Sequence, residues 1–163
     1  MTTIDQLQVR RAEPDDAGTV MTLLGELAEH QGQSDSVQVT TEGYRTLLER
    51  PDVVVLIAER AGEPVGYVSA TRSLNLWAGR DIMRLDDLYV RPDARAGGVG
   101  GVLMAEMARL AAAEQMIVRW EAEVDNEPAH RFYGRLGARL RTKVIAAWTP
   151  DRYASLVSQG SSS

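Results

Sequence analysis

The fold is decided by residues 85–101, which read LDDLYVRPDARAGGVGG. The strand candidate Met83–Val90 runs into a turn with glycine at four of five consecutive positions, and Val102–Glu114 follows with the composition of a helix. A strand that ends in such a turn and opens a helix collects backbone N–H groups at the positive end of the helix dipole, where a phosphate binds. A tight connection without a ligand needs fewer glycines. The stretch therefore predicts an anion-binding turn.

Two familiar phosphate loops do not fit this turn. It lacks the Gly-Lys-Ser/Thr ending of a P-loop, and its glycine spacing differs from the dinucleotide-binding G-x-G-x-x-G. Neither nucleotide-binding interpretation is therefore favoured.

Strand and helix signals alternate along the rest of the chain. Apolar residues recur at helical spacing within Val20–Ala28, after the acidic, proline-containing start Glu13–Asp16. We expect Thr41 to cap a second helix, which Pro51 closes off. The other predicted elements are strands at Leu7–Arg11, Val53–Ala58, Val65–Ser69 and Ile117–Val124, a short helix at Glu127–Leu136, an extended strand or tight hairpin at Ala138–Trp148, and a helical turn at Pro150–Val157.

This order of elements predicts a mixed α/β domain built on one central sheet. A length of 163 residues suffices for one domain with a sizeable core and hardly for two. We therefore assign residues 1–157 to a single domain and residues 158–163 to a disordered polar tail.

The composition excludes several classes of function. Eighteen Lys and Arg against 23 Asp and Glu give a net charge of −5, which disfavours a sequence-independent nucleic-acid binder. Cysteine is absent, so thiolate nucleophiles, acyl-cysteine intermediates and cysteine-based zinc sites are excluded, and two distant histidines predict no metal site. No basic start precedes an apolar run, and no apolar stretch approaches about 20 residues. We expect a cytoplasmic protein that does not interact with a membrane.

Two motifs resemble the GNAT superfamily of N-acetyltransferases. The segment RAGGVG (residues 95–100), after a strand ending in Leu88–Val90, resembles that family's acetyl-CoA pyrophosphate loop. The segment NEPAHRFYGRLGA (residues 126–138) resembles its second cofactor-binding element, and the two occur in the family's order. The resemblance covers roughly Val9–Trp148. It implies a mixed, mainly antiparallel central sheet flanked by helices.

Within the superfamily the chain is most similar to the diamine (spermidine/spermine) N-acetyltransferase branch. The similarity rests on four short segments, LAEHQ (27–31), WAG (77–79), LDD (85–87) and NEP (126–128). Dimers are common in that branch, so the resemblance also implies a homodimer.

The resemblance implies how acetyl-CoA is held. Strand backbone would pair with the pantetheine arm, main-chain amides of the glycine turn would hold the pyrophosphate, an arginine would add charge, and an asparagine would contact the cofactor amide. Plainer alternatives are a core strand, a solvated arginine and a helix-capping asparagine. The residues concerned are Leu88, Tyr89, Val90, Arg95, Ala96, Gly97, Gly98, Val99, Gly100, Gly101 and Asn126.

The catalytic assignments also follow from the resemblance. Tyr133 would protonate the CoA thiolate, since a phenol with a pKa of about 10 is a suitable acid. Asp86 would accept the proton of the attacking amine through a water, and Asp87 would bind the amine or stabilise the structure. Neighbouring strand residues point to opposite faces of a sheet, so we expect only one of these carboxyl groups to face the acetyl group.

The acceptor site departs from the branch. Trp77 would wall an alkyl chain or stack on a cation, while His30 and Gln31 lie where the branch has a Tyr-Glu pair. Gln31 replaces a carboxylate. Where the branch has acidic residues, this chain has Arg139, Arg141 and Lys143. These differences favour a shorter amine, an amino-acid-like molecule with its own carboxylate, or an aminated antibiotic over a polyamine.

The sequence thus predicts an acetyl-CoA-dependent N-acetyltransferase that acts on the primary amine of a small molecule. Without cysteine to hold an acyl group, we expect direct attack in a ternary complex. Two alternatives stay open, a protein or peptide N-acetyltransferase and a non-catalytic acyl-CoA-binding module on the same fold.

Overall fold

The most extensive strand pairing in the computed structural model, which describes residues 6–160, joins β3 (Glu63–Asn75) to β4 (Arg80–Val90) in antiparallel register. β2 (Val53–Arg60) lies on the other side of β3 and pairs in turn with β1 (Leu7–Arg11), again antiparallel. The β-branched and aliphatic run of β2 is buried along most of its length, as its composition predicts.

A parallel strand completes the sheet. β5 (Val118–Arg119) pairs with β4 alone and gives the order β1-β2-β3-β4-β5. The expected mixed, mainly antiparallel sheet is confirmed. The strand predicted at Ile117–Val124 is much shorter than expected.

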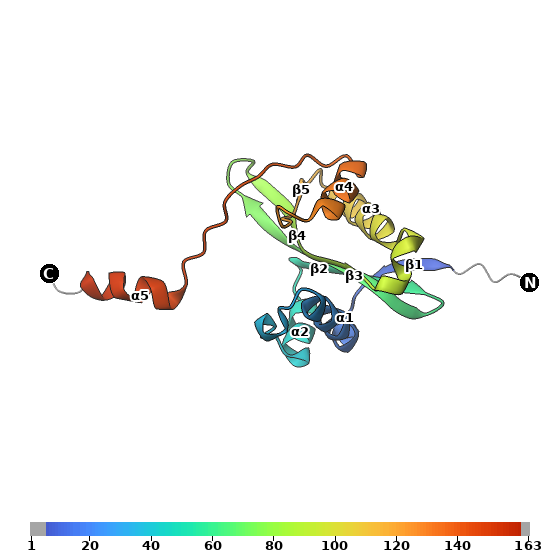
Figure 1. Cartoon of the computed structure of the whole chain (residues 1–163), viewed down its shortest axis with the longest axis horizontal. Coiled ribbons are helices and arrows are strands. Elements are labelled where there is room, and N and C mark those ends of the chain that lie inside the picture. Colours follow the sequence, from blue (N-terminus) through green and yellow to red (C-terminus); the bar gives the residue numbers. More distant parts are fainter. Residues whose placement is uncertain (1–5, 161–163) are drawn as a thin grey trace, which may run out of the picture. The chain divides into compact units, whose positions relative to one another are not determined.

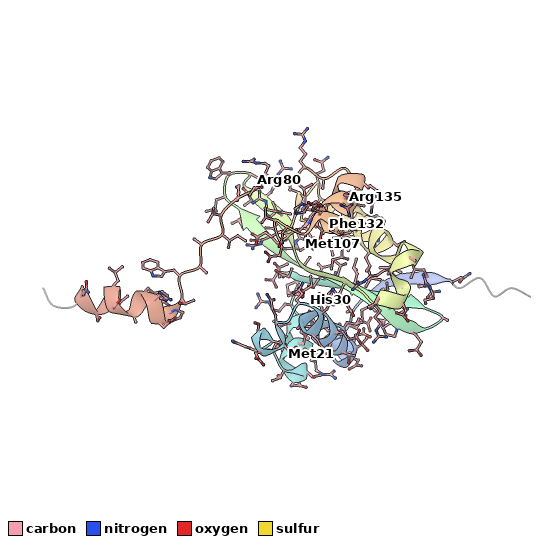
Figure 2. All side chains as sticks on the ribbon, in the orientation of Figure 1. Met21, His30, Arg80, Met107, Phe132 and Arg135 are labelled. Carbon is pink, nitrogen blue, oxygen red and sulfur yellow. The ribbon has the colours of Figure 1, made fainter. Side chains whose placement is uncertain are left out.

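Helices cover both faces of this sheet (Figure 1). α1 (Ala17–His30) and α2 (Thr41–Leu48) lie on one face, and α3 (Val99–Ala112) lies on the other. Figure 2 marks the two layers by Met21 on α1 and Met107 on α3, which is fully buried. The core beneath α1 and α2 is made by Ala12, Ala17, Val20, Leu23, Leu27, Tyr44, Val55, Ile57, Tyr67 and Tyr89.

The N-terminus of α2 corrects one prediction. The capping residue is Thr40, whose Oγ1 accepts a hydrogen bond of 3.0 Å from the Gly43 amide, and Thr41 is the first helical residue. Either threonine satisfies the sequence pattern, but only Thr40 has the extended backbone that a capping residue needs.

The connection from β4 to α3 depends on a left-handed glycine. A short 3-10 turn, η3 (Pro92–Gly97), follows β4, and Gly98 then reverses the chain at a φ of 71° before Val99 begins the helix. A residue with a Cβ is strained in that conformation, so the turn requires glycine at this position.

Residues 122–160 belong to a second compact unit, divided from the first at Glu121. This unit contains α4 (Glu127–Arg135) and α5 (Pro150–Gln159). The strand or hairpin predicted at Ala138–Trp148 is wrong, because residues 138–149 form neither helix nor strand. Their alternating apolar pattern suits a strand, yet the described part of this unit offers no second strand for backbone pairing.

The last helix is slightly longer than its predicted range. α5 continues to Gln159, two residues into the segment that we expected to be a disordered tail. Residues 1–5 and 161–163, which the predicted domain and tail include, lie outside the described residues. Among helices within residues 6–160, none is long and apolar enough to span a membrane.

The close approach of β3 to β4 generates a stability prediction. A Cβ on Gly66 would lie 2.6 Å from the Tyr89 carbonyl oxygen and 3.2 Å from the Val90 Cα, both backbone atoms of the neighbouring strand. We expect Gly66→Ala to lower the free energy of unfolding by about 2 kcal/mol or more, because the two strands must separate. Chemical denaturation measures this difference.

Gly25→Ala is the matched control. Gly25 lies within α1 and a Cβ there meets nothing within 4 Å. This variant should be more stable than the parent by about 0.5–1 kcal/mol, since alanine favours helix. Equal effects of the two substitutions would contradict the proposed backbone conflict at Gly66.

Candidate active site

A β-bulge lies at the acidic pair of β4. Ser69 of β3 pairs with Asp87, but the next residue, Ala70, pairs with Leu85, so Asp86 is an extra residue without a partner on β3. An inserted residue interrupts the alternation of side chains along a strand. The expectation that Asp86 and Asp87 point to opposite faces is therefore wrong.

Both carboxyl groups act on the same tyrosines. Tyr44 of α2 and Tyr67 of β3 each have a raised pKa, first because they are buried and then because the charges of Asp87 and Asp86 are near. The pKa of Tyr44 rises to about 12. Tyr44 and Tyr67 belong to the core beneath α1 and α2. The two acids thus lie together on that face of the sheet.

The two acids differ in their surroundings. Asp87 accepts hydrogen bonds from the Tyr67 hydroxyl at 3.1 Å and the Ser69 hydroxyl at 3.4 Å, and its own amide donates to the Ser69 oxygen at 3.2 Å. Asp86 has its pKa raised, mainly by desolvation and then by the charge of Asp87, while the charge of Arg84 acts in the opposite direction. Asp86 is therefore more basic than an ordinary aspartate, and Asp87 is held in a fixed position by its hydrogen bonds.

A cavity of about 250 Å³ opens beside Asp87. Gln31, at the end of α1, also lines it, so the structure brings together two residues that the sequence assigns to acceptor binding. Most other lining groups are apolar or neutral: Leu24, Leu27, Ala28, Gln33, Ser36, Val37, Gln38 and Val39. Asp87 is the only charged lining residue within the described part of the chain, which suits a small ligand with one cation.

Two other predicted acceptor residues do not line this cavity. His30 is exposed at the end of α1 and is labelled in Figure 2. Trp77 is fully exposed at the β3–β4 turn, where its amide donates to the Asn75 side chain at 3.0 Å. Their assignment to substrate binding stays a prediction.

The edge of β4 after the bulge is open. β5 pairs with β4 only at Met83 and Arg84, so within residues 6–121 no strand lies beside Leu88–Val90 on that edge. An extended chain with amide groups, such as pantetheine, fits an unpaired strand edge. The Val90 carbonyl is already used, because the Arg95 Nε donates to it at 3.0 Å.

The glycine turn after β4 fits an anion. No side chain within residues 6–160 caps the N-terminus of α3, and a Cβ on Gly98 or Gly101 would meet nothing within 4 Å. The first backbone N–H groups of a helix have no acceptor within the helix. The turn therefore offers donors and open space to an anion.

A partly buried ion pair joins the start of this turn to α1. Arg91 donates to Glu26 of α1 through Nε at 3.0 Å and Nη2 at 2.8 Å, and through Nη1 to the Pro64 carbonyl at 2.8 Å. The Tyr89 hydroxyl donates to the same carboxylate at 3.3 Å. These bonds, Arg91 first, lower the pKa of Glu26.

The second unit carries the remaining predicted residues. Asn126 caps α4 by accepting a hydrogen bond of 3.3 Å from the Ala129 amide, which is its plainer predicted role. Tyr133 lies on α4 with its ring centroid 5.5 Å from that of Phe132, and burial raises the pKa of its phenol. A phenol with a raised pKa keeps its proton at neutral pH and can donate it.

Sequence reasoning missed the groups that surround the acids. Tyr44 was one of several apolar positions on α2, and Tyr67 and Ser69 were ordinary strand residues. Their relation to Asp87 follows from the β3–β4 register, which composition does not specify. Within residues 6–160 no group of three or more His, Asp and Glu residues is placed to hold a metal ion.

The chain is similar to known acetyltransferases in sequence and in fold. The chain is 33% identical over 148 residues to the thialysine N-epsilon-acetyltransferase of Bos taurus, covering 84% of this chain and 86% of that protein. It is 31% identical over 133 residues to the aminoalkylphosphonate N-acetyltransferase of Salmonella typhimurium, covering 80% and 83%. A solved structure of the aminoglycoside N-acetyltransferase AAC(6')-Iy in complex with CoA has the same fold, with a TM-score of 0.75, 15% identity and coverage of 91% and 98%.

The family match extends across both compact units. Residues 24–138 match the Acetyltransferase (GNAT) family, and this range includes the acidic bulge, the glycine turn and α4. The relatives from Bos taurus and Salmonella typhimurium are both named as N-acetyltransferases. On this evidence the chain belongs to the acetyltransferase (GNAT) family and is an N-acetyltransferase of the kind that uses acetyl-CoA.

Proposed function

We propose that this enzyme transfers the acetyl group of acetyl-CoA to the primary amine of a small molecule that also carries an anionic group. The observation that carries the proposal is the pair of acids at the β4 bulge, one hydrogen-bonded by two hydroxyl groups and the other partly desolvated. One acid binds the ammonium group and the other removes its proton, which are the two requirements for activating an amine at neutral pH.

Acetyl-CoA supplies an activated thioester. The residues that hold it are the open edge of Leu88–Val90 and the main-chain amides of Ala96–Gly101. The Nε of Arg95 donates a hydrogen bond to the Val90 carbonyl and stabilises the end of the strand. The other N–H groups of its guanidinium remain to contact phosphate. Asn126 caps α4 and orients that helix.

Asp87 binds the amine. Its carboxylate lines the cavity of about 250 Å³ and is fixed by Tyr67 and Ser69, so it offers a charged acceptor without losing side-chain freedom on binding. Asp86 removes the proton, directly or through a water. The raised pKa of Asp86 makes it a better base than a surface aspartate.

Tyr133 protonates the departing CoA thiolate. Its buried phenol retains the proton until the sulfur needs it. Asp86 first takes one proton from the ammonium group. The amine nitrogen then forms a bond to the acetyl carbon, the carbon–sulfur bond breaks, the phenol proton of Tyr133 passes to the sulfur, and the second proton that the nitrogen loses restores the phenol. Because the sequence contains no cysteine, we propose direct attack in a ternary complex.

The substrate class rests on two observations. The cavity offers one carboxylate rather than the series of acids that a long polycation needs, and Arg139, Arg141 and Lys143 add cations near the end of the family match. Thialysine and aminoalkylphosphonates, which the names of two relatives give as substrates, each combine a primary amine with an anionic group. Homodimerisation stays a prediction from the family resemblance, and a cytoplasmic location stays a prediction from the sequence pattern.

A matched substrate screen tests the proposed class. CoA release should be followed with thialysine and its decarboxylated diamine, with 2-aminoethylphosphonate and ethanolamine, and with spermidine and a lysine peptide. We expect kcat/KM to be about tenfold higher or more for the anionic member of each matched pair. Preference for spermidine would contradict the anionic substrate, and activity confined to the peptide would favour the protein acetyltransferase.

The three catalytic assignments predict different kinetic defects. Tyr133→Phe and Asp86→Asn should each lower kcat by about 100-fold or more, because each removes a proton transfer. Asp87→Asn should mainly raise KM for the amine. Tyr153→Phe, which changes a tyrosine of α5, is the control and should keep the parent's kcat. Steady-state kinetics and calorimetric binding of acetyl-CoA separate these effects, and an unchanged rate for Tyr133→Phe would remove it from the mechanism.

The acid pair predicts a pH-dependent gain in stability on neutralising Asp86. A raised pKa means that the folded protein binds the Asp86 proton more tightly than the unfolded chain does, so ionisation at about pH 7 destabilises the fold. Asp86→Asn should therefore have a higher Tm than the parent at about pH 7. The difference should shrink as the pH falls through the carboxyl pKa.

Asp125→Asn, at an exposed position of the second unit, controls for the change in net charge. Thermal unfolding followed by circular dichroism across the pH range measures both variants. A lower Tm for Asp86→Asn at about pH 7 would show that Asp86 contributes favourable contacts instead.

A further inference from the structure

We infer that Arg60 binds the pyrophosphate of acetyl-CoA, with its guanidinium held over the glycine turn that leads into α3. Neither family motif includes this residue, which lies at the end of β2. The inference rests on the proposed function, because it takes the turn at Ala96–Gly101 to be the phosphate site.

The alternation of side chains along β2 places Arg60 next to the glycine turn. Leu56 and Ala58 are buried on the face of the sheet that does not contribute to the core beneath α1, and α3 contacts β2. Arg60 is the next residue of that row and is half-buried at the end of the strand. Its side chain therefore emerges beside the N-terminal end of α3.

The contact between Arg60 and Gly97 fixes the position of the guanidinium. A Cβ on Gly97 would collide with Nη2 of Arg60 and come within 3.2 Å of its Cζ and 3.3 Å of Nη1. Gly97 has no positive φ, so its backbone does not require glycine. Glycine at this position instead makes room for the guanidinium against the turn.

The other two arginines of this region have different partners. Arg91 is committed to Glu26 and the Pro64 carbonyl, and Arg95 donates its Nε to the Val90 carbonyl. Arg60 has interactions of its own, and its guanidinium lies directly against Gly97 at the start of the turn. A planar guanidinium with five N–H donors matches the paired oxygens of a diphosphate while it keeps other contacts.

Calorimetric binding of CoA to Arg60→Gln tests the assignment. We expect affinity to fall about tenfold relative to the parent, because a charge-assisted contact to phosphate is lost. Arg109→Gln is the matched control: it removes one arginine near the other end of α3, where the side chain pairs with Glu106, and should bind CoA as the parent does. Circular dichroism and the Tm of each variant verify that it is folded.

Two shortened ligands identify the group that Arg60 contacts. 3′-Dephospho-CoA keeps the pyrophosphate, so Arg60→Gln should weaken its binding by the same factor as for CoA. Pantetheine lacks every phosphate and should compete equally well for both proteins. A loss seen only with CoA would assign Arg60 to the 3′-phosphate, and an equal loss with pantetheine would assign it to folding of the site; either result overturns the inference.

A double-mutant cycle with Gly97→Ala tests the contact itself. The three atoms nearest to the added methyl all belong to the flexible end of Arg60, so the variant should fold and displace the guanidinium, lowering CoA affinity several-fold. In the Arg60→Gln background the same substitution should have little further effect. Additive losses, or unchanged affinity for Arg60→Gln, would overturn the inference, whereas a parent protein that binds no CoA would refute the proposed function itself.

Discussion

One inserted residue organises the candidate active site. Asp86 has no partner on β3, so the alternation of side chains along β4 is interrupted there. The carboxyl groups of Asp86 and Asp87 therefore lie on the same face of the sheet. A regular strand would have separated them across the sheet. The same irregularity lies just beyond the short pairing with β5, so β4 leaves the bulge with an open edge that leads directly into the glycine turn. Acid pair and cofactor edge thus share one local cause.

The bulge has an energetic consequence. Two like charges lie close together against a wall of buried tyrosines, and each charge raises the pKa of those phenols. Such an arrangement is unfavourable for folding unless a cation arrives. The fold compensates on the same face through the hydroxyl groups of Tyr67 and Ser69 and through a continuous aliphatic core beneath α1. Stability is therefore lowered where an ammonium ligand would restore it.

Much of the fold was predictable because its signals are local. Glycine spacing, helical periodicity and the Asn126 cap each act within a few residues, and the helices, β2 and β4 lie close to their predicted ranges. β3 (Glu63–Asn75) is much longer than the predicted strand at Val65–Ser69. The choice of Thr40 over Thr41 was not predictable, since it depends on one backbone conformation. The bulge was also missed, because it is a property of the register between two strands.

The tyrosines around the acid pair could not be predicted for the same physical reason. Tyr44 and Tyr67 come from a helix and a strand that approach Asp87 only in the folded protein. They lie far from Asp87 in the sequence, and no local sequence pattern relates the three residues. The segment at residues 138–149 has a strand's pattern without a partner in its own unit, which shows that alternation alone does not form a strand. Motifs thus identified the family, and packing determined which groups surround the acid pair.

The tie between Arg91 and Glu26 connects two ligand sites. Arg91 begins the glycine turn, and Glu26 directly precedes Leu27 and Ala28 on α1, which line the cavity beside Asp87. Ordering of the turn by one ligand restrains this ion pair and, through it, the cavity wall. The second ligand then loses less conformational freedom when it binds, and thermodynamic linkage makes the benefit equal in both directions. We therefore expect the two substrates to bind with positive cooperativity through this ion pair.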